Sequence, residues 1–155
     1  MKFKMNRGVD IMNKKGFTLV ELLAVIAIIA IIAFITTPII LNVIQTSKEN
    51  AFRDTAHGLV VAAGTYQAEK QALNEDTTLL INYQTSSDAE KDVLKTKGVL
   101  PDAGELSIDE NGKVTLALWS DDAHVCVVKD ASAKDIKINK NISSAASCTI
   151  ANINK

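Results

Sequence analysis

One group of side chains has residue types that could carry out nucleophilic or metal chemistry. It holds a histidine and a cysteine two positions apart, preceded by a serine and two aspartates: Ser120, Asp121, Asp122, His124 and Cys126. On a strand, the histidine and the cysteine would share one face, where they could supply a thiolate nucleophile with its base or bind a metal ion. Their spacing matches no catalytic or metal-site motif, whereas an acidic hairpin turn beside an ordinary strand accounts for all five. We therefore expect no enzyme activity, no cofactor and no metal, with calcium at Asp121 and Asp122 as the lesser alternative.

A second chemically unusual residue is a carboxylate beside a long apolar run. Residues 22–44 carry no formal charge and consist mostly of Ile, Leu, Val and Ala, yet Glu21 directly precedes them. As a helix this run is about 35 Å long, which exceeds the roughly 30 Å hydrocarbon core of a bilayer. A carboxylate in this place either lies at the membrane interface, near the positive end of the helix dipole, or gains a cationic partner.

The charges before the apolar run predict its orientation. Residues 1–16 contain five Lys or Arg and one Asp, a net charge of +4, and cationic flanks stay in the cytoplasm. The chain after Gln45 is therefore expected outside the membrane. A secretory signal peptide would have a shorter apolar run closed by a cleavage site of small residues, so it is disfavoured. A plain membrane anchor explains length and orientation equally well.

The residues around Glu21 form a more specific pattern. The stretch KKGFTLVELL, residues 14–23, resembles the type III signal sequence of prepilins, which type IV pilins share with the pseudopilins of type II secretion and competence systems. The resemblance implies that a prepilin peptidase cleaves between Gly16 and Phe17 and methylates the new amine of Phe17. It covers residues 14 to about 60. The leader is long for this family, and Met12 is a possible alternative start that leaves the cleavage site unchanged.

The resemblance also implies roles for two residues of the apolar run. Glu21 would meet the Phe17 amine of a neighbouring subunit during assembly, so that a charge that is costly in lipid gains a partner. Pro38 matches the helix-kinking proline of many pilins, because it has no N–H to donate to the carbonyl of Phe34. A helix that ended before Pro38 would be too short to span a bilayer, so we expect the helix to continue through it.

The region after the membrane has the pattern of one helix followed by several strands. Apolar residues recur at helical spacing and predict a helix that continues to about Leu73, with one buried face: Phe52, Ala56, Leu59, Ala63, Tyr66 and Leu73. Residues 74–103 are expected to form a loop region around a short helix at 88–96. Strands are predicted at 105–108 and 113–119 around an Asn111-Gly112 turn, at 124–128, and more weakly at 136–138 and 148–150. The predicted fold class is α+β and pilin-like, with a long N-terminal helix packed on a small antiparallel sheet.

The two cysteines lie in the region expected outside the cytoplasm. A single disulfide between Cys126 and Cys148, which ties the C-terminal segment to the sheet, is the favoured interpretation, and many pilins close a C-terminal loop in this way. Two free thiols remain the alternative if the protein matures without an oxidising system. Residues 46–155 hold 12 Lys plus Arg and 16 Asp plus Glu, a net charge of −4, which disfavours direct nucleic-acid binding.

These observations divide the chain into three expected parts. Residues 1–16 are a prepilin leader, residues 17–45 a transmembrane and assembly helix, and residues 46–155 an exported pilin-like domain. The function expected is that of a structural subunit in a type IV pilus-like filament, either a homopolymer or mixed with other pilins. Its expected partners are prepilin peptidase, the pilus assembly platform and, before assembly, the inner or cytoplasmic membrane, with the filament itself extracellular. The alternatives are a pseudopilin of a secretion or DNA-uptake machine and a membrane-anchored exoprotein that does not polymerise.

Overall fold

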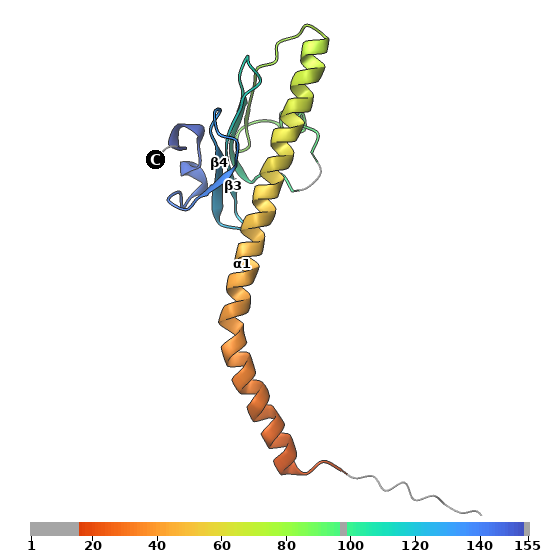
Figure 1. The fold of residues 1–155 in the computed structure, drawn as a ribbon, viewed down its shortest axis with the longest axis vertical. Coiled ribbons are helices and arrows are strands. Elements are labelled where there is room, and N and C mark those ends of the chain that lie inside the picture. The colour runs from red at the N-terminus through yellow and green to blue at the C-terminus, as the bar shows by residue number, and fades with distance from the viewer. Residues whose placement is uncertain (1–15, 97–98, 154–155) are drawn as a thin grey trace, which may run out of the picture. The chain divides into compact units, whose positions relative to one another are not determined.

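A computed structural model describes residues 16–96 and 99–153 (Figure 1). Most of the expected leader, including Met12 and the lysines of the KKG sequence, lies outside the described residues. The contacts divide the chain into two units that meet between Leu41 and Asn42. Each unit is described by itself below.

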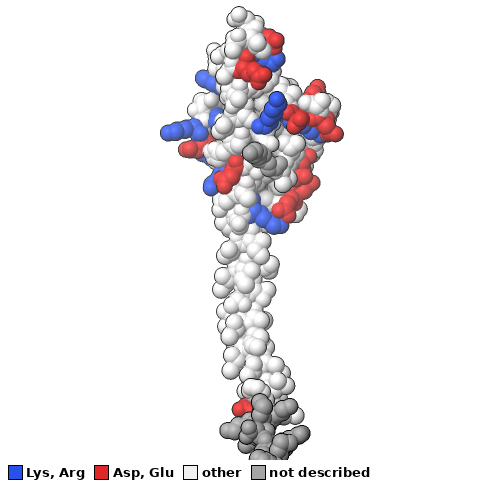
Figure 2. Space-filling view, turned by 90° about the vertical axis from the view of Figure 1, so that its right-hand side faces the viewer, with Lys and Arg blue, Asp and Glu red and all other residues white. Residues whose placement is uncertain are grey.

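Helix α1 spans Leu19–Ala72. The first unit ends at Leu41 and contains the N-terminal, apolar part of this helix. Within the described residues, α1 is the one helix long and apolar enough to cross a membrane, and none of its apolar window is buried inside the chain. The helix continues through Pro38, as predicted. Figure 2 shows how the two units differ in surface charge. The visible surface of the apolar segment is uncharged, whereas Lys, Arg, Asp and Glu side chains cover much of the second unit.

The second unit contains a five-stranded sheet in which sequence neighbours pair in order and every pair is antiparallel. The strands are β1 Leu79–Asn82, β2 Ala103–Ile108, β3 Val114–Ser120, β4 Val125–Lys129 and β5 Lys137–Asn139. A short helix α2, Asp88–Lys91, lies between β1 and β2, and two 3₁₀ helices follow β5, η1 Ala145–Ser147 and η2 Ile150–Asn152.

One face of this sheet packs against the second half of α1. The apolar stripe of the helix is buried at Phe52, Ala56, Leu59 and Ala63, and Tyr66 is partly buried against the same core. Facing it are alternate residues of the central strands, because successive strand side chains point to opposite faces: Leu106, Ile108, Val114, Leu116, Leu118, Val125 and Val127. The stripe is thus confirmed except at its end, since α1 stops at Ala72 and Leu73 is exposed.

The other face of the sheet is covered by the C-terminal segment. In Figure 1 this segment, drawn in blue, lies on the side of the sheet opposite α1. The residues between those of the first face form a second core with it: Ala103, Ala117, Trp119, Cys126, Val128, Ile142 and Cys148. Strands β3 and β4 are therefore covered on both sides, which explains why they read as nearly continuous apolar runs. The observed architecture is the predicted α+β, pilin-like one.

Most element boundaries agree with the sequence to within two residues, but three expectations were wrong. Residues 74–103 were expected to be loop, yet β1 adds an edge strand there; its four residues are too few to show alternation beside polar neighbours. Helix α2 begins at Asp88 as expected but ends at Lys91 rather than 96, because the chain turns to bury Leu94 in the core. The strand expected at 148–150 does not exist; Cys148 lies between η1 and η2, and the edge of β4 is already paired with β5.

The predicted Asn-Gly turn lies at the hairpin between β2 and β3. The Gly112 N–H donates to the Asp109 carbonyl at 2.9 Å, and the Asp109 side chain accepts from the Lys113 N–H at 2.8 Å. Gly112 has φ +74°, and a Cβ built there would lie 1.7 Å from Nε2 of Gln67 on α1. Glycine is favoured here by the left-handed backbone, whereas the contact is with the flexible end of the Gln67 side chain, which can move aside.

Candidate functional site

The predicted cleavage junction lies in exposed chain just before α1. Residues 16–18 have no regular secondary structure, and the Phe17 side chain is 89% exposed. A Cβ built on Gly16 would contact nothing within 4 Å, so the backbone on this side is open. A protease needs an accessible backbone, and this junction presents one.

Glu21 forms a capping box with Thr18 at the start of α1. The Thr18 N–H and the Thr18 hydroxyl both donate to Glu21 Oε2 at 2.9 Å, and the Glu21 N–H donates to Thr18 Oγ1 at 3.2 Å. The Thr18 carbonyl accepts the first helical hydrogen bond, from the Leu22 N–H at 3.2 Å. Thr18 is therefore the N-cap, and its reciprocal bonds with Glu21 satisfy donors that a helix end leaves unpaired.

This arrangement gives the carboxylate an intrachain partner that the sequence interpretation overlooked. The signal was present, because Thr18-Leu19-Val20-Glu21 has the spacing of a capping box before an apolar run. Within the described residues, the bonds that Glu21 accepts use Oε2, which leaves Oε1 able to accept from a further donor. The capping box also orients the carboxylate along the helix terminus, where the helix dipole favours negative charge.

The helix around Pro38 contains side-chain bonds to the backbone that the sequence reading did not predict. The Thr36 hydroxyl donates to the carbonyl of Ile32 at 3.0 Å, and the Thr37 hydroxyl donates to that of Ala33 at 2.7 Å. Threonine bonds of this kind commonly accompany helix bending. They occupy the turn just before the one that loses its hydrogen bond at Pro38. The kink itself stays a prediction.

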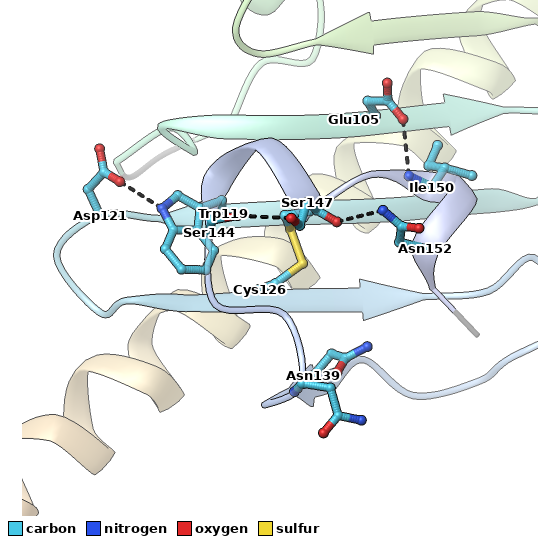
Figure 3. The surroundings of a disulfide bond; sticks show 11 residues. Glu105, Trp119, Asp121, Cys126, Asn139, Ser144, Ser147, Ile150 and Asn152 are labelled. Atoms are coloured by element: carbon cyan, nitrogen blue, oxygen red, sulfur yellow. Dashed lines mark hydrogen bonds between the residues drawn. A yellow bond between two sulfur atoms is a disulfide. The ribbon is translucent and has the colours of Figure 1, made fainter. Parts of the chain in front are cut away.

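A disulfide joins Cys126 and Cys148, the pair that the sequence favoured. Their Cα atoms are 5.8 Å apart, and both residues are fully buried. Cys126 lies in β4 opposite Trp119 of β3, so the bond fastens the C-terminal segment over the middle of the sheet (Figure 3).

A second tie holds the same segment to β2. The Ile150 N–H donates to Glu105 Oε2 at 3.0 Å, as Figure 3 shows, and the other carboxylate oxygen of Glu105 accepts a longer bond from Asn82. Glu105 was not singled out in the sequence, because its partner lies 45 positions away. Together with the disulfide, this bond fixes the C-terminal cover at β2 and β4, the two strands on either side of β3.

The residues considered for catalysis or metal binding do not form one site. Cys126 is in the disulfide, and His124 is exposed in the β3–β4 turn with φ +51°, so the strand begins one residue later than predicted. Asp121 accepts from the Trp119 indole N–H at 2.6 Å, whereas Asp122 lies 2.7 Å from Lys48 Nζ. Ser120 is buried and accepts from the Ala123 N–H. Among the described residues, no three His, Cys, Asp or Glu side chains are placed to hold one metal ion.

Residues 11–37 match the model of the prokaryotic N-terminal methylation motif. The chain carries the signature of type IV pilins and pseudopilins. That signature implies a structural protein, made as a precursor that prepilin peptidase processes. The match spans the Gly16 and Phe17 junction, the capping box and most of the apolar run. Searches of curated proteins and of solved structures find no match.

Proposed function

We propose that this protein is the precursor of a structural subunit in a type IV pilus-like surface filament. The observation that carries the proposal is the methylation motif at residues 11–37, placed at the start of a helix whose N-terminal apolar stretch is not buried against any described residue. The pilin-like exported unit supports the same reading. Surface-exposed apolar helices need either lipid or other helices around them. The helix of a filament subunit is surrounded by lipid before assembly and by the helices of other subunits afterwards.

Maturation begins at the junction between Gly16 and Phe17. Prepilin peptidase hydrolyses that peptide bond, which frees the amine of Phe17 for methylation. The exposed chain on both sides of the bond and the open space at Gly16 support this position. The mature chain then consists of residues 17–45, which span the membrane and later assemble, and residues 46–155, which form the exported domain.

Assembly depends on the carboxylate of Glu21. In the precursor this carboxylate is held by Thr18 through Oε2, so its position at the helix start is fixed before any second subunit arrives. The Phe17 amine of an entering subunit supplies a cationic donor for Oε1. Because a buried charge in lipid is costly unless paired, this pairing favours the assembled state over the isolated one.

The precursor is a single-pass protein of the inner or cytoplasmic membrane with its N-terminus in the cytoplasm. The +4 charge of residues 1–16 and the uncharged residues 22–44 support that orientation. A pseudopilin of a secretion or DNA-uptake system would share every one of these features. Surface fibres that contain the protein distinguish a pilus subunit from a pseudopilin.

The proposal is tested by Glu21→Gln at matched expression, with the processed membrane pool compared with protein sheared from the cell surface. We expect cleavage after Gly16 to persist, because the changed residue lies beyond the cut, and sheared protein to fall strongly. Leu23→Gln, two residues away in the same run, serves as the control, because it introduces the same amide side chain while the Glu21 carboxylate is kept. Equal fibre yield from Glu21→Gln and wild type would contradict the assembly role.

A further inference from the structure

The peptide bond between Gly16 and Phe17 lies just outside the hydrogen-bond ladder of α1. The first carbonyl that accepts a helical bond is that of Thr18, from the Leu22 N–H at 3.2 Å. Among the described residues, no group donates a hydrogen bond to the carbonyl of Gly16 or to that of Phe17. The carbonyl that a peptidase must attack is therefore free, two residues before the ladder begins.

A free carbonyl is a requirement of the cleavage chemistry. Hydrolysis adds water to the Gly16 carbonyl carbon, breaks the bond to the Phe17 nitrogen and leaves that nitrogen with the proton it needs to become an amine. The Gly16 oxygen carries the negative charge that develops on the way, so the enzyme must place its own hydrogen-bond donors there. A carbonyl that already accepts a helical N–H is held along the helix axis and shielded by the next turn.

The hydroxyl of Thr18 determines where the ladder stops. In a helix that began one residue earlier, the Glu21 N–H would donate to the carbonyl of Phe17. One residue earlier still, the Val20 N–H would donate to the carbonyl of Gly16. In the structure the Glu21 N–H donates instead to Thr18 Oγ1 at 3.2 Å, and the Thr18 N–H is taken up by Glu21 Oε2 at 2.9 Å. The side chain of Thr18 thus removes the donor that would extend the helix toward the junction.

The residues before Thr18 would allow that extension. Glycine is tolerated as an N-cap, so Gly16 could take over this position if the threonine cap were lost. The scissile carbonyl would then accept the first helical bond, because that is what an N-cap carbonyl does. In an apolar environment an unpaired N–H is especially costly, which favours such a bond for the N–H of Val20.

We propose that Thr18 is a positioning residue for prepilin peptidase: its cap keeps the Gly16 carbonyl outside the helix and so keeps the junction cleavable. This role rests on the proposed function, because the cleavage it serves is assigned there. It is separate from the assembly role of Glu21. Cleavage would depend on the Thr18 hydroxyl and on an acceptor at position 21, whereas assembly would depend on the charge of that acceptor.

Four variants separate the hydroxyl from other properties of this segment. Thr18→Ala removes the hydroxyl and introduces the residue with the highest helix propensity. Thr18→Ser keeps an N-cap of at least equal preference. Glu21→Gln keeps a capping-box acceptor without the charge. Thr36→Ala is the matched control, because it removes a hydroxyl that also bonds to the backbone of α1 but lies 18 positions beyond Thr18.

The test measures the initial rate at which prepilin peptidase cleaves the full-length precursor in detergent micelles, with the product identified by N-terminal sequencing. We expect Thr18→Ala to lower the rate by about 2- to 30-fold, the range that corresponds to the loss of one N-cap. Thr18→Ser, Glu21→Gln and Thr36→Ala should keep the wild-type rate.

Amide hydrogen exchange of the uncleaved precursor provides a second readout. The Val20 N–H has no acceptor among the described residues, so it should exchange rapidly in wild type. In Thr18→Ala its exchange should slow, because it gains the carbonyl of Gly16.

Equal cleavage of Thr18→Ala and wild type would overturn the inference and leave the filament proposal intact, since wild type is still cut at the same bond. Faster cleavage of Thr18→Ala would also overturn it, because the capped helix start would then obstruct the enzyme. A slow Thr18→Ala that Thr18→Ser does not rescue, or whose Val20 amide exchanges as in wild type, would assign the loss to a cause other than the cap. Failure of wild type to be cut at this bond would contradict the maturation step of the proposed function as well.

Discussion

Residues 19–41 and residues 42–72 belong to one helix, but their apolar side chains have different surroundings. In the first stretch, large apolar side chains are exposed all around the helix, for example Ile26, Ile31 and Phe34. In the second stretch, Leu59 and Ala63 are completely buried against the sheet. A helix that is apolar all round requires an apolar environment, whereas one with an apolar stripe requires a single packing partner. The second stretch finds that partner in its own chain, whereas the first is not buried against any described residue. Under the proposed function, lipid and then neighbouring subunits surround the first stretch.

The largest change in stability is expected from a substitution in the half of α1 that packs on the sheet. Leu59→Ala removes a fully buried side chain at the centre of the helix-side core, which should lower the free energy of unfolding by about 2–5 kcal/mol. Val61→Ala, two residues away but exposed, should change it by less than about 0.5 kcal/mol. Denaturant unfolding of the full chain in detergent, followed through Trp119, measures both. Similar losses in the two variants would mean that the sheet is not the partner of this stripe.

A smaller effect is expected on the opposite face of the sheet. Replacing both cysteines, Cys126→Ala with Cys148→Ala, should lower the free energy of unfolding by about 2–4 kcal/mol, since the open C-terminal segment gains conformational freedom in the unfolded chain. Limited proteolysis of the native protein should then cut within residues 143–153 first, while the helix-side core resists. Unchanged stability and unchanged cleavage would show that the Glu105 bond and apolar packing suffice to hold the cover.

The smallest effect concerns a polar atom inside the helix-side core. The Tyr83 hydroxyl is buried, and among the described residues it has no hydrogen-bond partner, so Tyr83→Phe should leave stability at neutral pH unchanged or raise it by up to about 1 kcal/mol. Burial also raises the pKa of Tyr83 to about 12.

That raised pKa predicts a dependence of stability on pH. In the unfolded chain a tyrosine loses its proton near its ordinary pKa of about 10, whereas the folded protein keeps it, so folding is favoured fully below about pH 10. Stability should fall as the pH rises from about 10 to about 12, and Tyr83→Phe should remove part of that slope. Unfolding at several pH values in both proteins provides the comparison. Identical slopes would place the Tyr83 hydroxyl in water.

The elements that the sequence predicted well are those whose signal is long or strongly apolar. The stripe of α1 repeats over several turns, and β3 and β4 are apolar runs bounded by turn residues, so their positions could be read without the structure. β1 was missed because four residues carry too little pattern. Residues 148–150 were misread because strand-like residues can equally cover a sheet face when a disulfide holds them there.

The site was predictable to a similar degree. The roles of Gly16, Phe17 and Glu21 rest on a motif whose residues are adjacent in the sequence, and they stay predictions. The capping box of Thr18 with Glu21 could have been found from its spacing. The Glu105 bond to Ile150 could not be predicted, because it depends on how the C-terminal segment lies across the sheet. Interactions between residues close in the sequence could be predicted from it, whereas contacts between distant segments became known only from the structure.

The most direct test of the central claim is the intact mass and N-terminal sequence of protein sheared from the cell surface. The account predicts a chain that begins at Phe17 with a methylated amine and contains a disulfide between Cys126 and Cys148. Gly16→Val should abolish this product and leave the leader attached to protein in the membrane, because a side chain at the junction obstructs the peptidase. A mature N-terminus downstream of Ile44 would contradict the account and identify residues 1–44 as an ordinary secretory signal.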